Sequence, residues 1–404
     1  MRIGVVSEYF DLSGSTPTVL HNLVHYLHRA HPEITFEVIA SRNIYRGTET
    51  FPARETQEGI QIFRSATPKS NRQSTSRRLA AGMVFTAAAL QQLLRRPRYD
   101  ALLIVTNPPS LPMGARMLRR LRGTPYVYLV HDLYPDVANV LGVLERHSQL
   151  SRLLHSRQQA WLSDAARVIV LGRDMRDYLV KNYQTPRERI EVIPNWSDPD
   201  EVSPSSTSTF RQRNQLEGIV ALYSGNFGMH QDFDVILDAA KILRGRNPKI
   251  VFALAGEGQR KEGIAARIAA EKIENVRLFP LAPRSEYSDM LAAADIGLVS
   301  LARGTEGMGV PSKFYNVLAS GRPAVAVVPR DSEVALVLGE TGSGLQVDSG
   351  NAEALASAID QLARDDSLRS AMGMRARQVL VENYTIEKLG ERFFEVFKSV
   401  ADGK

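Results

Sequence analysis

The sequence contains no cysteine, which excludes disulfide bonds, thiolate zinc sites and a cysteine nucleophile. It also lacks the Gly-x4-Gly-Lys-Ser/Thr phosphate loop and, after its first strand-like run, a strict Gly-x-Gly-x-x-Gly fingerprint. These two absences disfavour an ATPase or kinase of the phosphate-loop type and a dinucleotide-dependent dehydrogenase. The largely apolar segment 79–94 is shorter than the roughly 20 residues that a membrane-spanning helix requires.

The length and composition are those of a folded globular protein. At 404 residues the chain is long enough for two domains, and its 44% apolar and 23% charged residues are close to the averages for such proteins. The N-terminus runs from Met1 directly into Ile3, Val5 and Val6, which is typical of a first strand and not of a secretion signal. We therefore expect a cytoplasmic location.

Positive charge is concentrated in the first half. Between Arg42 and Arg122 there are fifteen Lys or Arg residues against four acidic residues, although the formal charge of the whole chain is only +6. Such a block is compatible with a polyanionic partner, namely nucleic acid, an anionic membrane or a phosphorylated lipid, and equally with an ordinary solvated surface. Segment 79–94 is flanked by arginines, so it predicts either a packed helix or a helix lying on a membrane surface. The flanking residues are Arg77, Arg78, Arg95 and Arg96.

Short β-branched runs alternate with segments of helical period along the whole chain. This pattern predicts an α/β fold with two Rossmann-like, doubly wound domains, each built on a parallel sheet. The predicted strands of the first half are 3–7, 36–40, 60–64, 101–106, 126–130, 168–171 and 191–193. Those of the second half are 219–224, 250–255, 276–279, 296–301, 324–328 and 344–347.

Domain boundaries follow from composition. A serine- and proline-rich stretch predicts a linker at 201–217, between a first domain at 1–200 and a second domain at 218–384. Residues 385–404 predict a helix whose apolar stripe, which includes Phe393 and Phe397, packs back across the domain junction.

Small and polar residues follow several predicted strands at the carboxyl ends, where open parallel sheets bind ligands. Gly14 precedes an amphipathic helix whose amides suit a phosphate or sugar. Ser224, Gly225 and Asn226 would let the backbone approach a diphosphate, and Gly256 could line a nucleotide pocket. Each of these segments is also compatible with an ordinary strand-to-helix turn.

Two further segments carry chemically useful side chains. His131 ends the strand 126–130 and could bind a sugar hydroxyl or stabilise developing charge, or could simply be a packed or capping residue. The loop 304–313 places Glu306 and Lys313 beside three glycines, a combination suited to holding sugar hydroxyls and phosphate. The histidines at 21, 25 and 28 have metal-like spacing, but without an accompanying glutamate they favour a solvated face.

Taken together, these segments resemble the family four glycosyltransferases of the GT-B fold over essentially the whole chain. The sequence looks most like the bacterial branch that builds O-antigen and exopolysaccharide, including fucosamine and colanic acid transferases. The segments that carry the resemblance are the loop at Gly14 and residues 131–136, 193–196, 223–226, 310–315 and 321–323.

The resemblance implies two domains that face each other across a cleft, the first for the acceptor and the second for the nucleotide sugar. It implies retaining transfer from a UDP-sugar, or less readily a GDP-sugar, with no cofactor and no metal. The acceptor would be polyprenyl-diphosphate-linked or an oligosaccharide. The protein would lie peripherally on an anionic membrane surface and would have no nucleic acid partner. Catalysis would then rest on positioning and charge stabilisation.

Site residues follow from the resemblance by motif position. Glu306 would contact donor sugar hydroxyls with the amides of Gly307, Met308 and Gly309, and His131 would lie near the reacting carbon. Gly14, Ser224, Gly225 and Asn226 would surround the diphosphate, and Ser312 would lie in the same donor site. Phe314 or Asn316 stands where the family places a second glutamate, so Glu333 is a candidate for that role. Lys313 could replace phosphate-binding residues that are missing after Gly225.

Two other functions remain open at this stage. A nucleotide-sugar epimerase of the same fold would need additional acid and base carboxylates. A non-catalytic protein that binds nucleotide sugar or nucleic acid would be compatible with the missing second glutamate and the basic block.

Overall fold

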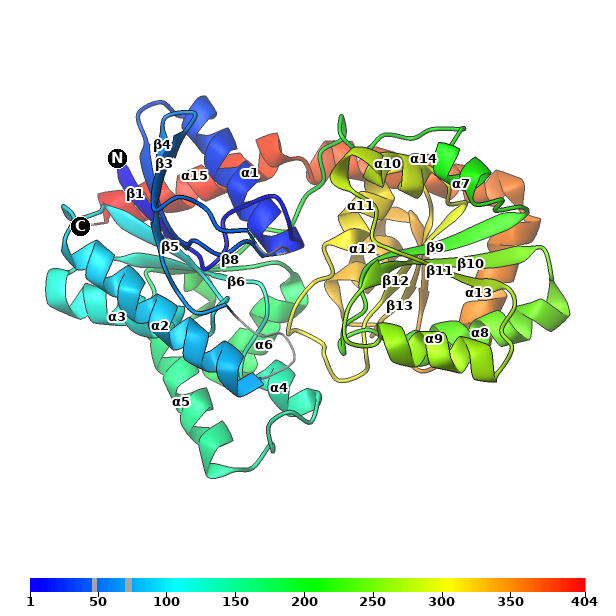
Figure 1. Cartoon of the computed structure of the whole chain (residues 1–404), viewed down its shortest axis with the longest axis horizontal. Coiled ribbons are helices and arrows are strands. Elements are labelled where there is room, and N and C mark those ends of the chain that lie inside the picture. The colour runs from blue at the N-terminus through cyan, green and yellow to red at the C-terminus, as the bar shows by residue number, and fades with distance from the viewer. Residues whose placement is uncertain (46–48, 70–74, 404) are drawn as a thin grey trace. The chain divides into compact units, whose positions relative to one another are not determined.

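A computed structural model describes residues 1–45, 49–69 and 75–403, which form two compact α/β units (Figure 1). The first unit comprises Met1–Pro194, Gly307–Gly309 and Ile386–Lys404. The second unit comprises Asn195–Glu306 and Val310–Thr385. The predicted two-domain α/β architecture is confirmed.

The first unit is built on an eight-stranded sheet in the order β3-β4-β2-β1-β5-β6-β7-β8. All neighbouring strands pair in parallel except β3, which is antiparallel to β4. The strands are β1 Arg2–Val6, β2 Thr35–Ser41, β3 Arg54–Gln57, β4 Ile60–Ser65, β5 Ala101–Val105, β6 Tyr126–Val130, β7 Arg167–Val170 and β8 Ile190–Val192. Strand β3 was not among the predicted strands, because this edge strand is polar and has no buried face to give it an apolar pattern.

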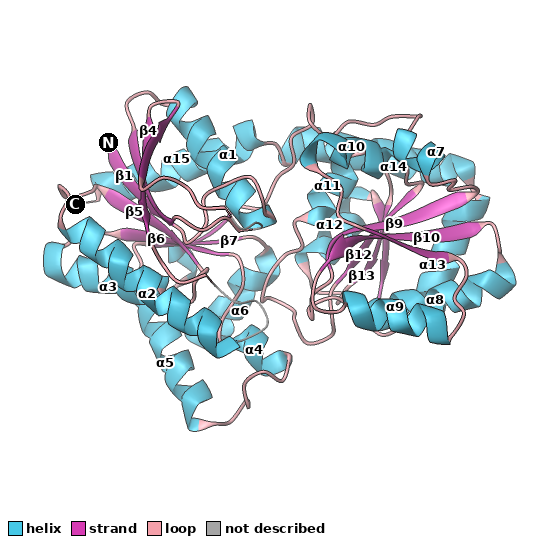
Figure 2. Ribbon diagram, viewed as in Figure 1, coloured by secondary structure: helices cyan, strands magenta, loops and turns pink. Residues whose placement is uncertain are grey.

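Helices cover both faces of this sheet (Figure 2). They are α1 Ser15–Ala30, α2 Thr75–Leu94, α3 Leu111–Arg122, α4 Asp136–Val140, α5 Gln149–Asp164, α6 Arg173–Tyr183, the 3-10 turn Arg187–Arg189 and α15 Ile386–Asp402. The ambiguous segment 79–94 lies in α2, where Ala81, Phe85 and Ala89 are buried while Leu79 and Met83 are about half exposed. Within the described residues, no helix is both long and apolar enough to cross a membrane.

The C-terminal helix α15 packs against α1 in the first unit. The hydroxyl of Tyr26 donates to Glu391 at 2.9 Å, and the rings of His31 and Phe394 stack with centroids 3.7 Å apart. Elsewhere on α1 the expectation of a solvated histidine face is wrong, because His25 is buried and its ring stacks on that of His21 at 4.1 Å. Glu58, at the turn between β3 and β4, accepts the hydrogen bond that fixes the His25 ring.

The second unit is built on a six-stranded parallel sheet in the order β11-β10-β9-β12-β13-β14. The strands are β9 Ile219–Asn226, β10 Ile250–Glu257, β11 Val276–Phe279, β12 Ile296–Ser300, β13 Ala324–Val327 and β14 Gly344–Val347. The helices are α7 Thr209–Arg213, α8 Phe233–Arg246, α9 Lys261–Ala270, α10 Arg284–Ala292, α11 Lys313–Ala319, α12 Glu333–Thr341, α13 Ala352–Arg364 and α14 Asp366–Asn383.

The stretch 201–217 differs from the expected linker because it folds onto the second unit. Ser208 caps α7, and the backbone amides of Thr209 and Phe210 each donate to Asp289 of α10 at 2.8 Å. The ring of Phe210 packs edge-on against Phe279. Polar composition suggested an exposed tether, but these contacts are formed by capping groups that composition alone does not reveal. The N-terminal segment of the first unit runs to Pro194, whereas the predicted boundary was at 200.

Strand order locates one ligand-binding edge in each unit. The chain builds one side of the first sheet outward from β1 and then returns to build the other side from β5, so the order reverses between β1 and β5. In the second sheet the reversal falls between β9 and β12. Ligands of open α/β sheets bind at the carboxyl ends of the strands at such a reversal.

Candidate active site

The reversal point of the second unit is closed by two loops that hydrogen-bond to each other. The amide of Ala302, after β12, donates to the carbonyl of His230 at 2.7 Å, and the amide of Asp232 donates to the Ser300 hydroxyl at 2.9 Å. Ser224, Gly225 and Asn226 occupy the end of β9 beside this junction, with Ser224 buried and Asn226 exposed. Three of the predicted donor-binding residues are therefore at the edge that the topology selects.

Lys313 crosses the end of β9 from the start of α11. Its Nζ donates to the Tyr223 hydroxyl and lies 4.1 Å from the centroid of that ring. Gly225 permits this approach, because a Cβ there would lie 2.9 Å from Lys313 Cε and its φ of +143° is disfavoured for other residues. Burial lowers the pKa of Lys313 to about 7. Within the described part of the chain only burial acts on this pKa, so an anionic ligand at the strand end would supply an opposite charge.

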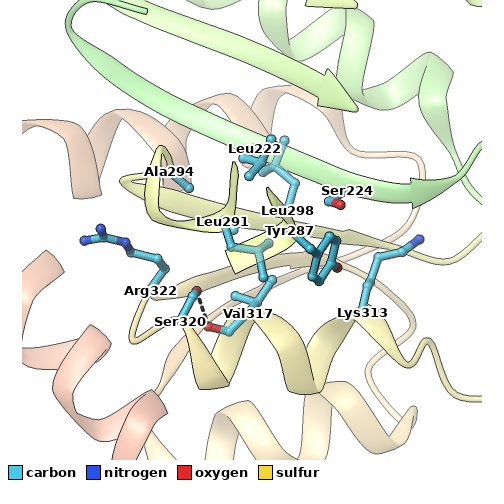
Figure 3. Close-up of a pocket in the computed structure, with 11 residues that line it drawn as sticks. Leu222, Ser224, Tyr287, Leu291, Ala294, Leu298, Lys313, Val317, Ser320 and Arg322 are labelled. Atoms are coloured by element: carbon cyan, nitrogen blue, oxygen red, sulfur yellow. Dashed lines mark hydrogen bonds between the residues drawn. The ribbon is translucent and has the colours of Figure 1, made fainter. Parts of the chain in front are cut away.

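A small cavity lies beneath the strand end, between β9, β12 and helices α10 and α11. Figure 3 shows Ser224 and Tyr287 at one part of its lining and Ser320 and Arg322 at another. Its volume of about 10 Å³ is enough for a single water molecule but far too small for a nucleotide. A donor in this unit would therefore lie on the outer side of the strand end and not in this cavity.

Glu306 helps to shape the glycine-rich loop after β12. Its Oε1 accepts a hydrogen bond from the amide of Gly304 at 3.1 Å, and the neighbouring Thr305 hydroxyl donates to the carbonyl of Ala302 at 2.7 Å. Gly304 and Gly307 have φ values of +87° and +70°, which the loop could not adopt with most other residues. The loop is thus fixed by internal hydrogen bonds, and one carboxylate oxygen of Glu306 takes part in them.

Residues Gly307–Gly309 pack with the first unit, against the segment that follows β6. The amide of Leu133 donates to the carbonyl of Met308 at 2.9 Å, and the Met308 side chain is buried. A Cβ on Gly307 would lie 2.6 Å from Tyr178 Cβ, so glycine is required by the contact with α6 as well as by its φ. A Cβ on Gly309 would lie 3.1 Å from the carbonyl oxygen of His131. The structure therefore brings together His131, Gly307, Met308 and Gly309.

His131 is held at the carboxyl end of β6 with a buried, uncharged ring. Its amide donates to the Thr106 hydroxyl at 3.1 Å, which anchors the residue to the end of β5. The side chain is 8% exposed, and burial lowers its pKa to about 4. Among the described residues, Nε2 has no hydrogen-bond partner. A neutral imidazole with a free nitrogen can form one hydrogen bond with a ligand, and it adds no charge to the site.

Sequence reasoning missed the buried Asp136, which supports this arrangement. Its carboxylate accepts hydrogen bonds from Tyr178 at 2.6 Å and from Tyr183, and the Tyr183 hydroxyl also contacts His155 Nδ1 at 3.0 Å. Asp136 thereby fixes the Tyr178 ring on which Gly307 rests. The signal was present as the final residue of the segment 131–136, but its tyrosine partners lie more than forty positions away.

The remaining predicted residues have more varied surroundings. Gly14 is the N-cap of α1, and a Cβ there would lie 2.2 Å from the ring of Tyr45. Gly256 has a packing role, because a Cβ there would lie 2.0 Å from the carbonyl oxygen of Gly225. Ser312 directly precedes α11, and Glu333 is buried in the first turn of α12. Ser312 and Glu333 therefore start helices that follow β12 and β13.

Two family models match the chain, one in each half. Residues 14–196 match the glycosyl transferase 4-like domain, and residues 206–379 match the glycosyl transferases group 1 model. A probable glycosyltransferase, WbjE of Pseudomonas aeruginosa, is 32% identical over 95% of this chain and 94% of its own length. WcaI of Escherichia coli, a putative colanic acid biosynthesis glycosyl transferase, is 26% identical over 71% of this chain and 72% of its own.

The fold is likewise shared with solved structures. HepE of Anabaena, in complex with UDP and glucose, has a TM-score of 0.71 and 16% identity, covering 99% of this chain and all of its own. The two α/β units thus have the GT-B fold. The chain belongs to the family four glycosyltransferases, as the sequence resemblance predicted.

Proposed function

We propose that this glycosyltransferase transfers a sugar from a UDP-sugar to a lipid-linked or saccharide acceptor, with retention of the anomeric configuration, in surface polysaccharide biosynthesis. The observation that carries the donor assignment is Lys313, an amine with a lowered pKa beside Ser224 and Gly225 at the reversal point of the second sheet. The names of WbjE and WcaI support the class of pathway, and the UDP in HepE supports the nucleotide.

In this proposal the side chains bind and orient, and none acts as a nucleophile. Lys313 and the backbone at Gly225 and Asn226 hold the diphosphate, while Glu306 and the amides of 307–309 hold the donor sugar. The acceptor oxygen bonds to the anomeric carbon on the face from which the bond to diphosphate breaks. The acceptor proton passes to a diphosphate oxygen. Neutral His131 offers a hydrogen bond near the reacting carbon without adding positive charge to an already electron-poor centre.

Glu333 is our proposal for the ribose contact that the family assigns to a second glutamate. Of the two residues at the aligned positions, Phe314 is fully buried, and the side-chain amide of Asn316 donates to the Tyr287 hydroxyl at 3.1 Å. Both are therefore engaged in packing the second unit. Glu333 begins the helix after β13, the strand next to β12, at the same carboxyl edge of the sheet.

The donor assignment is tested by substituting Lys313 with Met, which keeps the length of the side chain but removes the amine. We expect the affinity for UDP to fall about 10- to 100-fold, because a charge-assisted contact to phosphate is lost. Lys241→Met is the matched control, since Lys241 lies on the exposed face of α8 and pairs with Glu271. Unchanged UDP affinity in Lys313→Met would remove this residue from the donor site.

An assay of the sugar products and of UDP release, with and without an acceptor, separates the two alternative functions. An epimerase would convert the sugar of the bound donor at one carbon and return an altered sugar, whereas a binding protein would shift in thermal stability with the donor but release no UDP. Transfer instead requires UDP release that depends on an acceptor.

We further propose that helices α2 and α3 rest on an anionic membrane that carries the acceptor. Met113, Met117 and Leu121 recur every four residues along α3 and are 41–58% exposed. Helix α2, which contacts α3, also exposes Leu79 and Met83. Exposed arginines on α3 add the positive charge that anionic lipids attract. Of the four arginines that flank residues 79–94, Arg96 has a structural role in the first unit. It pairs with Glu37 at 3.6 Å and stacks on the ring of Phe63.

This membrane proposal is tested by sedimentation with anionic and with zwitterionic vesicles. Replacing Met117 and Leu121 with Ser, and separately Arg119 and Arg120 with Glu, should each weaken sedimentation with the anionic vesicles. Arg364→Glu on α13, an exposed arginine of the second unit, is the control. Equal sedimentation of all variants would show that this face is an ordinary solvated surface.

A further inference from the structure

Glu8 lies at the reversal point of the first sheet and has no part in the mechanism above. It follows β1 by two residues, and the strand register pairs Val6 with Ile104 and Ile104 with Tyr128. Extending that register places Glu8 level with Thr106 and with the residue before His131. Because neighbouring strands are about 5 Å apart, this register corresponds to a backbone separation of roughly 10 Å between the ends of β1 and β6.

The Glu8 side chain is buried without satisfying its hydrogen-bonding capacity. It is 3% exposed, and within residues 1–45, 49–69 and 75–403 its Oε1 has no hydrogen-bond partner. A buried, unpaired carboxyl oxygen is costly to the fold, and such groups call for a specific explanation. The residue's backbone already serves the fold, since its carbonyl accepts from the amide of Ser41 at 2.9 Å, but any residue could supply that contact.

The charges near Glu8 indicate which chemical groups of a ligand this carboxyl could bind. Burial raises the pKa of Glu8 to about 7, while a hydrogen bond with Tyr9 and the charge of Arg78 act to lower it. Arg78 also acts on Tyr134, so its guanidinium is within electrostatic reach of both residues. An ionised carboxylate at this point repels a phosphate, whereas the carboxyl group can form a hydrogen bond with a hydroxyl in either protonation state.

We propose that the Glu8 carboxyl binds a hydroxyl group of the acceptor saccharide, in a subsite at the β1/β5 reversal point. This inference rests on the proposed transfer reaction and assigns to its acceptor a contact in the first unit. Glu8 positions the acceptor and does not touch the donor. Both residues lie at the carboxyl edge of the first sheet, at the ends of β1 and β6 on either side of β5.

The experiment compares Glu8→Gln and Glu8→Ala with the unaltered protein and with Glu33→Gln. Glu33 is an exposed carboxylate that precedes β2, at the amino ends of the strands of the same sheet. It serves as the matched control. The donor is the UDP-sugar that the unaltered protein hydrolyses, and the acceptor probes are octyl glycosides of glucose, galactose, mannose and N-acetylglucosamine. Three quantities are measured: UDP affinity, UDP release without glycoside, and glycoside-dependent UDP release.

We expect Glu8→Ala to lower glycoside-dependent release about 10- to 100-fold, and Glu8→Gln to lower it less because an amide still binds a hydroxyl. UDP affinity and release without glycoside should stay within about twofold of the unaltered protein. Three results would overturn the inference. They are unchanged glycoside-dependent release in both Glu8 variants, a parallel loss of all three quantities, and no stimulation of the unaltered protein by any glycoside. Failure of the unaltered protein to bind or hydrolyse any UDP-sugar would instead overturn the proposed function itself.

Discussion

The buried carboxyl of Glu8 should make the stability of the first unit depend on pH. In the folded chain burial raises its pKa from 4.5 to about 7, whereas in the unfolded chain it ionises near the ordinary value. Between these two values the folded state binds more protons than the unfolded state, so stability falls as pH rises through this window. The difference between a pKa of 4.5 and one of about 7 corresponds to about 3 kcal/mol of unfolding free energy, a penalty that is absent below pH 4 and nearly complete at about pH 8.

Glu8→Gln removes this penalty because glutamine does not ionise. The variant should therefore gain stability relative to the unaltered protein as pH rises, by roughly 2.5 kcal/mol between pH 5 and pH 8. Urea unfolding followed by tryptophan fluorescence measures this gain in stability, provided that the fluorescence comes from the first unit alone. The chain has two tryptophans, Trp161 in the first unit and Trp196 in the second, so a Trp196→Phe background leaves Trp161 as the reporter.

The comparison between the two proteins at each pH cancels the titration of every other group. A stability difference that stays constant from pH 5 to pH 8 would show that Glu8 ionises normally in the fold, and that its carboxyl is not held in a water-poor crevice. A difference that grows in the opposite direction would show that Arg78 outweighs burial and keeps the carboxylate charged.

Three further predictions concern the donor side. Since burial lowers the pKa of Lys313 to about 7, UDP binding at pH 8 should take up close to one proton, measured by calorimetry in buffers of different ionisation heat, and Lys313→Met should take up none. Gly307→Ala should reduce UDP release tenfold or more while the protein stays folded, because a Cβ would strike Tyr178; a wild-type rate would show that the loop yields freely. Glu306→Gln should strongly lower turnover with an unchanged melting temperature, and full activity would place Glu306 outside the site.

Most of the fold was accessible from the sequence because its strands are buried on both faces. Runs such as 101–105 and 126–130 are continuous and apolar, as parallel sheets covered by helices require, and their positions were predicted within a residue. The exposed edge strand β3 has no such pattern. The stretch 201–217 was assigned by polarity to a linker, yet its polar groups cap α7 and bind Asp289.

The candidate site could be predicted only in part, because only some of its residues are marked by the strand pattern. Residues at strand ends, such as His131 and Gly225, could be found because the position follows from the strand pattern. Gly256 had the same signal but packs against the carbonyl of Gly225, a contact set by strand pairing. Glu8 and Asp136 were missed because their significance lies in burial and in partners, or missing partners, that are distant in sequence.

The most direct test of the account is a screen of the purified protein against UDP-sugars and GDP-sugars, following thermal stability and free nucleotide diphosphate together. We predict that one UDP-sugar raises the melting temperature and is slowly hydrolysed to UDP, and that Lys313→Met loses both responses while Lys241→Met keeps them. Stabilisation by a donor without any release of nucleotide diphosphate, or no response to any donor, would contradict the assignment of this chain as a UDP-sugar-dependent transferase.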